Sequence, residues 1–327
     1  MARDPRACAM PWRMRLLFGC CCVWRAAATA VPTPPRVLIF SLGDDYGFNN
    51  VGYPHGPGLY ANPEARTPTL NELALGGVRL ERHYVYKYCS PTRSSFLTGR
   101  LPVHVNQDNE CNDASSTSGA DLRMTLLPQK LKLAGYETAA VGKWHCGARS
   151  TANLPINRGF DHHLGFLKGG EDHFQQNHCA GSPYAPLAVS LSGCPDASVR
   201  WLCLSGGPDA STVDLWLDHA TADGLNGTYS AFMYAEKAVS LLEDFGRRAK
   251  ANATAKMFMY LPWHDVHAPL QAPDRFQYQP FFNDSYTPRL MLNAMASALD
   301  EGMRNVTDAI KTAGLWGDCL IVWSADK

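Results

Sequence analysis

The chain has 327 residues, equal numbers of basic and acidic side chains, and 46% hydrophobic residues. That length and hydrophobic content are sufficient for a large buried core, and they exclude an intrinsically disordered chain. The formal net charge of zero gives no indication of a nucleic-acid-binding surface or of a polybasic membrane patch.

The N-terminus resembles a targeting segment. We predict that residues 1–30 are a signal peptide and that residues 31–327 form the folded domain. Several arginines precede a short apolar run at residues 16–24, and residues 26–30 offer a small-residue cleavage site. The run is shorter than the roughly 20 residues that a membrane-spanning helix needs. Arg25 directly after the run leaves an organelle transit peptide as the competing interpretation.

Two further features favour the secretory pathway. Four Asn-X-Ser/Thr sequons are sites for glycosylation, at Asn226, Asn252, Asn283 and Asn305. An odd number of cysteines, seven, lies beyond residue 30, and if Cys89 is used for chemistry the other six can pair: Cys111, Cys146, Cys179, Cys194, Cys203 and Cys319. Cys179 could pair with Cys194 or with Cys203.

The first predicted strand covers residues 36–42, a continuous apolar run typical of a strand buried on both faces. It ends in Asp44 and Asp45. Adjacent carboxylates at the end of a buried strand are unfavourable unless a cation neutralises them, so a metal site and a solvated turn are the two interpretations. Residues 67–74 predict a helix with Thr67 or Thr69 as its N-cap, and residues 78–86 predict a strand.

A loop that turns into a helix is predicted next, around residues 89–99. Pro91 fits a first helical turn, and Gly99 can end the helix. Cys89 would then lie at or just before a helix N-terminus, where the helix dipole is expected to lower the pKa of a thiol. The alternative is a buried structural cysteine or half of a disulfide.

Residues 126–134 predict a helix, and residues 135–145 predict a strand that carries Lys143 and His145 at its C-terminal end. The stretch 147–229 has little periodicity, and we predict long loops around a site. Its polar clusters, residues 161–163 and 173–178, match no zinc spacing and are interpreted as loop residues.

The last elements are a helix at 230–250, a strand at 256–262, a helix at 290–313 and a strand at 318–327. His264 and His267 follow the strand predicted at 256–262, and Asp326 lies at the end of the last strand. Alternation of buried strands with helices predicts an α/β fold built on a large mixed, mostly parallel sheet flanked by helices. Such folds place their sites at the carboxyl ends of the strands, where these polar residues gather.

Two motifs resemble the signatures of the sulfatase family in the alkaline-phosphatase superfamily. They are CSPTRSSFLTGR at 89–100 and GYETAAVGKWH at 135–145. The resemblance covers about residues 36–327, and residues 266–273 look most like the arylsulfatase B branch. It implies an alkaline-phosphatase-like fold and a sulfuric ester hydrolase that acts on a sulfated sugar or an aryl sulfate.

The resemblance also implies a mechanism and a maturation step. The formylglycine-generating enzyme would convert Cys89 to formylglycine in the endoplasmic reticulum, and the hydrated aldehyde would be the nucleophile. One calcium ion would be held by Asp44, Asp45, Asp326 and residue 89. Arg93 would hold the nucleophile or a metal ligand, and Lys143 would bind a sulfate oxygen. His145 would accept the proton of the hydrate, and His267 would be the general acid.

Two departures from the family pattern set further expectations. The family has an asparagine ligand after the position of Asp326, whereas this chain has Lys327, and the second downstream lysine and C-terminal subdomain of the family are not found. Cys146 is a smaller departure. We therefore expect a C-terminally truncated chain with an incomplete metal site.

The alternatives are a catalytically impaired fragment and a phosphatase or phosphodiesterase of the same superfamily. The expected location is secreted or lysosomal.

Overall fold

The computed structural model describes residues 33–54, 62–107, 109, 119–177, 213–277 and 288–327. The predicted signal peptide lies outside these ranges, as do Cys111, Cys179, Cys194 and Cys203. The described residues from Pro35 onward form one compact unit. Within the described ranges, no helix is long and apolar enough to cross a membrane.

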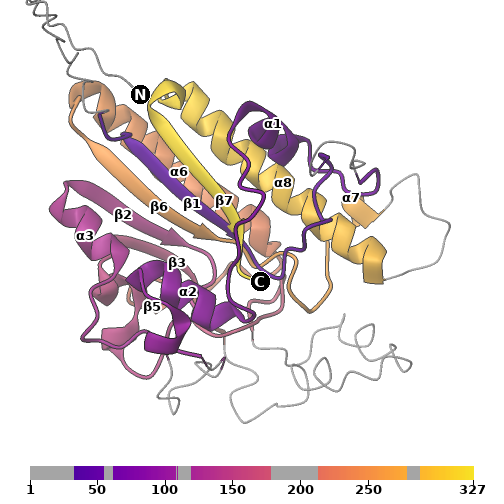
Figure 1. Cartoon of the computed structure of the whole chain (residues 1–327), viewed down its shortest axis with the longest axis horizontal. Coiled ribbons are helices and arrows are strands. Elements are labelled where there is room, and N and C mark those ends of the chain that lie inside the picture. The colour runs from indigo at the N-terminus through magenta and orange to yellow at the C-terminus, as the bar shows by residue number, and fades with distance from the viewer. Residues whose placement is uncertain (1–32, 55–61, 108, 110–118, 178–212, 278–287) are drawn as a thin grey trace, which may run out of the picture. The chain divides into compact units, whose positions relative to one another are not determined.

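A seven-stranded sheet forms the centre of this unit, with the strand order β5-β4-β3-β2-β6-β1-β7 (Figure 1). The five neighbouring strands β3, β2, β6, β1 and β7 pair in parallel. Strands β4 and β5 pair antiparallel at the β3 side of the sheet. The predicted mixed, mostly parallel sheet is therefore confirmed. The strands are β1 Val37–Gly43, β2 Tyr136–Val141, β3 His162–Phe166, β4 Leu215–Leu217, β5 Ala220–Thr221, β6 Lys256–Pro262 and β7 Cys319–Ala325.

Helices cover both faces of the sheet (Figure 1). The long helices α6 and α8 pack on one face, and α2 and α3 pack on the other. The α-helices are α1 Pro68–Gly76, α2 Cys89–Thr98, α3 Leu127–Leu133, α6 Ser230–Ala251, α7 Asp274–Gln277 and α8 Pro288–Thr312. Short 3-10 helices lie at Pro102–His104, Thr151–Asn153, Pro155–Arg158 and Trp316–Asp318.

Strand β6 shows why the sheet is buried on both sides. Met257 and Met259 point into the core shared with α6 and α8, whereas Phe258 and Tyr260 point into the core shared with α2 and α3. Alternate side chains of a strand point to opposite faces, so a continuous apolar run is needed to fill both cores. The apolar runs therefore predicted correctly the inner strands β1 and β6 and also β7, which ends the strand order.

The strand predicted at residues 78–86 is wrong. No strand pairs with this segment among the described residues, and most of it is exposed, with Val78 at 90% and Leu80 at 69%. An apolar, β-branched pattern supplies the side chains of a strand but not the neighbouring backbone that makes one.

The loop prediction for residues 147–229 is also wrong in part. This stretch contributes β3, β4 and β5, and His162 and His163 lie on β3 rather than in a loop. Gly165 permits this strand to approach β2, because a Cβ atom there would overlap the carbonyl oxygen of Gly142. A close backbone approach of this kind leaves no periodic signal in the sequence.

Helix α1 forms as predicted, but its N-terminus is satisfied from a distance. Thr67 is at the N-cap position without a side-chain capping bond. Asp300 of α8 instead accepts hydrogen bonds from the backbone N–H groups of Thr69 at 3.0 Å and Leu70 at 2.8 Å. The first N–H groups of a helix need acceptors, and here another helix provides them.

Candidate active site

The predicted site residues converge at one edge of the sheet. Asp44 follows β1, Lys143 follows β2, His267 follows β6 and Asp326 follows β7, and these four strands are parallel neighbours. The carboxyl ends of parallel strands meet at the same edge. The N-terminus of α2 brings Cys89 to that edge from the covering layer.

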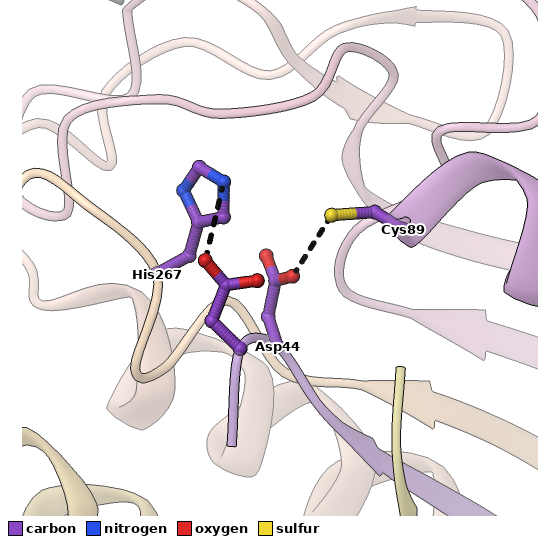
Figure 2. Close-up of side chains that lie close together, drawn as sticks. Asp44, Cys89 and His267 are labelled. Carbon is purple, nitrogen blue, oxygen red and sulfur yellow. Dashed lines mark hydrogen bonds and ion pairs between the residues drawn. The ribbon is translucent and has the colours of Figure 1, made fainter. Parts of the chain in front are cut away.

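Cys89 is the first residue of α2 and is 1% exposed. Gly99 ends the helix in the left-handed conformation, with φ of 67°, as the sequence predicted. The Cys89 thiol lies 3.6 Å from Oδ1 of Asp44 (Figure 2). The expectation of a lowered thiol pKa is wrong: burial raises the pKa of Cys89 and outweighs the nearby charge of Lys143. As a thiol, this residue stays protonated.

Asp44 is neutralised by two buried cations. Nζ of Lys143 lies 2.6 Å from Oδ2, and Nη2 of Arg93 lies 3.4 Å from Oδ1, with all three side chains fully buried. Burial opposes ionisation of Asp44, but the charges of Lys143 and Arg93 prevail and lower its pKa. The strand end therefore carries a charged network inside the protein.

Asp326 uses both carboxylate oxygens within the protein. Oδ2 accepts hydrogen bonds from Nε of Arg93 at 3.1 Å and from Nη2 at 2.8 Å. Oδ1 accepts one from the backbone N–H of Asp45 at 3.0 Å. Burial and the neighbouring charge of Asp44 raise the pKa of Asp326. Asp326, a predicted metal ligand, is thus the ion-pair partner of Arg93 in the structure.

Among the described residues, four side chains form a group that could hold a metal ion: Asp44, Asp45, Cys89 and His267. Their ligand atoms all lie within 4.8 Å of one another. The carboxylates of Asp44 and Asp45 fit a hard cation such as calcium, which prefers oxygen ligands. A thiol and an imidazole suit softer ions. The residues therefore fit calcium through the two aspartates, with an oxygen needed at position 89.

His145 and His267 complete the predicted set. Burial, followed by the charges of Lys143 and Arg93, lowers the pKa of His145 well below its usual value. Burial and then Lys143 lower the pKa of His267 to about 3. Nδ1 of His267 lies 2.7 Å from the carbonyl oxygen of Ala268, so this nitrogen carries the proton and Nε2 is the acceptor. Nε2 lies 3.9 Å from Oδ2 of Asp45.

His173 is a site residue that sequence reasoning missed, because it was interpreted as a loop residue. It is fully buried, with Nε2 3.1 Å from the carbonyl oxygen of His267 and Nδ1 2.8 Å from Oγ of Ser230. Its ring stacks on that of His264, with centroids 4.0 Å apart. These contacts join residues 57 and 94 positions apart, so no local spacing could reveal them.

Comparison with known proteins gives consistent matches. The family model described as Sulfatase matches residues 36–327. The chain is 35% identical to mouse arylsulfatase J and 30% identical to human arylsulfatase A, and both matches cover 92% of the present chain. It covers 44% and 54% of those proteins, so it spans about half the length of the curated relatives it matches.

Solved structures show the same fold. A sulfatase from Pseudoalteromonas sp., PsFucS1, superposes with a TM-score of 0.62 at 19% identity, over 90% of this chain and 55% of that one. The putative sulfatase yidJ from Bacteroides fragilis superposes with a TM-score of 0.59 at 18% identity, over 90% and 62%.

Proposed function

The chain belongs to the sulfatase family, and we propose that it hydrolyses sulfate esters with residue 89 as the nucleophile, after conversion of Cys89 to formylglycine. The observation that carries this proposal is the setting of Cys89. It begins a helix at the carboxyl edge of the sheet, and Asp44 lies beside it with the buried cations Arg93 and Lys143. A protonated thiol is a weak nucleophile, so oxidation to an aldehyde gives this position a chemical use.

The two added groups supply distinct chemistry. A formylglycine hydrate supplies a hydroxyl nucleophile and the oxygen that the metal group needs at position 89. A calcium ion supplies positive charge that acidifies this hydroxyl and attracts a sulfate oxygen. We propose Asp44, Asp45, Asp326 and residue 89 as the ligands of that ion.

The remaining side chains bind the substrate and move protons. Arg93 holds Asp44 and Asp326 in place, and Lys143 binds a sulfate oxygen when the ester enters beside Asp44. His145 accepts the proton of the hydrate, since its neutral imidazole is a base. His267 gives a proton to the leaving alcohol, and the negative charge of the ester favours the protonated ring that this step needs.

For the substrate we propose a sulfated sugar or an aryl sulfate. The names of the relatives support both classes. The match to human arylsulfatase A supports an aryl sulfate, and the match to human N-acetylgalactosamine-6-sulfatase, 34% identical over 146 residues, supports a sulfated sugar. The arylsulfatase B branch, expected from residues 266–273, stays a prediction.

We propose maturation in the secretory pathway and a secreted or lysosomal location, because the formylglycine-generating enzyme must reach the chain there. Three sequon asparagines support this route, since Asn226, Asn252 and Asn305 are exposed in the structure. Asn283 lies outside the described residues.

The test is expression with the formylglycine-generating enzyme, followed by an assay on an aryl sulfate. We expect turnover by the wild type and none above background for Cys89→Ala. The matched control Cys319→Ala, which removes another free thiol of the described chain, should retain turnover. Mass spectrometry of the residue-89 peptide should show the thiol-to-aldehyde loss. Full activity of Cys89→Ala would contradict the mechanism, and faster turnover of a phosphate ester would favour a phosphatase.

A further inference from the structure

Lys327 contacts the candidate metal group directly. Its Nζ lies 2.7 Å from Oδ1 of Asp45, one of the four side chains of that group. No hydrogen-bond partner is found for this buried oxygen among the described residues. The ammonium charge of Lys327 is therefore what stabilises the negative charge on Oδ1.

Lys327 differs from the other two cations of the site. Arg93 and Lys143 are fully buried and pair with fully buried carboxylates. Moving either cation away would leave a buried charge without its partner. The side chain of Lys327 is 32% exposed and that of Asp45 is 31% exposed. An ion pair with that exposure is weak, and its ammonium group can turn into solvent at little cost.

We propose that Lys327 is a displaceable counter-ion of the metal site, which competes with a divalent cation for Oδ1 of Asp45 and so weakens the affinity of the site. This inference rests on the calcium site proposed above. A divalent ion bound at Oδ1 of Asp45 would take the place of the ammonium group of Lys327, so that binding of one releases the other.

Electrostatics sets the size of the effect. A divalent ion and a single positive charge about 6 Å apart in a water-like dielectric repel each other enough to change a dissociation constant roughly tenfold. Lys327 can relieve part of that repulsion by turning away. We therefore expect its removal to tighten calcium binding by about threefold to tenfold.

Calcium titration calorimetry on the full chain tests the proposal. The variants are Lys327→Gln, which removes the charge, and Lys327→Arg, which keeps it. Lys250→Gln is the matched control, because it removes one charge from an exposed position on α6. A second measurement on the wild type does not depend on any variant folding: acetylation of Lys327 by an amine-reactive reagent, followed by mass spectrometry with and without calcium.

Support consists of tighter binding by Lys327→Gln, near wild-type binding by Lys327→Arg and Lys250→Gln, and faster acetylation of Lys327 in calcium. Equal calcium affinity of the wild type and Lys327→Gln would overturn the competition and leave the calcium site intact. Acetylation that does not respond to bound calcium would also overturn it. No calcium binding by any variant would overturn both the site and the inference.

Discussion

Arg93 donates two hydrogen bonds to a single carboxylate oxygen of Asp326, a residue 233 positions further along the chain. Its Nη1 also donates to the carbonyl oxygen of Lys143 at 3.0 Å. One guanidinium group therefore joins the start of α2 to the ends of β2 and β7. The planar fork of arginine donors suits this arrangement, which the point charge of lysine could not reproduce.

We predict that Arg93→Met destabilises the protein by about 3–5 kcal/mol, because it leaves Asp326 as a buried charge without its partner and removes one of the two cations beside Asp44. Denaturation by guanidinium chloride, followed by tryptophan fluorescence, measures the change. Arg93→Lys restores the charge without the fork and should lose less stability. A loss below about 1 kcal/mol for Arg93→Met would show that water or other groups satisfy the carboxylates.

Gly165 is predicted to be intolerant of any side chain. In Gly165→Ala the added Cβ would overlap the backbone of Gly142, which cannot move without breaking the junction between β2 and β3. We expect a loss of at least about 3 kcal/mol or a failure to fold, measured as unfolding free energy and soluble yield. Gly76→Ala is the control, since nothing lies within 4 Å of its added Cβ, and it should leave stability nearly unchanged.

His163 should make the protein sensitive to acid. Burial lowers the pKa of His163 to about 4, and its Nδ1 donates to the carbonyl oxygen of Ala140. Below about pH 6.5 the imidazole of His163 binds a proton in the unfolded chain but stays neutral in the folded protein. The free energy of unfolding therefore falls as the pH drops from about 6.5 to 4.

In His163→Asn, the amide can still donate to the carbonyl oxygen of Ala140, but it does not bind a proton in this pH range. The contribution of residue 163 to the pH dependence of stability should therefore disappear. We expect the slope of unfolding free energy against pH to decrease by up to about 1.4 kcal/mol per pH unit in that interval. An identical slope for the wild type and His163→Asn would contradict the prediction.

His173 is predicted to position His267 for catalysis. His173→Leu removes the hydrogen bond to the His267 carbonyl, and we expect kcat for an aryl sulfate to fall about 10- to 100-fold with little change in KM. His173→Gln keeps a donor and should recover much of the loss. If both variants lose equal activity in proportion to their lost stability, the role of His173 is only structural.

Local patterns in the sequence determined much of this protein. The apolar runs placed the central strands, Pro91 indicated the first turn of helix α2 and Gly99 its end, and two motifs indicated the family. These features depend on side-chain periodicity and backbone sterics, which act over a few residues. They also located the site at the carboxyl ends of the strands.

Only the tertiary structure decided the properties that depend on burial and on distant partners. The thiol of Cys89 has a raised rather than a lowered pKa, because desolvation in the folded protein outweighs the nearby charge of Lys143. Asp300 replaces a local cap of α1, and His173 reaches His267 across the fold. The segment 78–86 has the side chains of a strand, but within the described part of the chain no neighbouring strand pairs with it. Dielectric environment and long-range contact are properties of the assembled chain, and no spacing along the sequence encodes them.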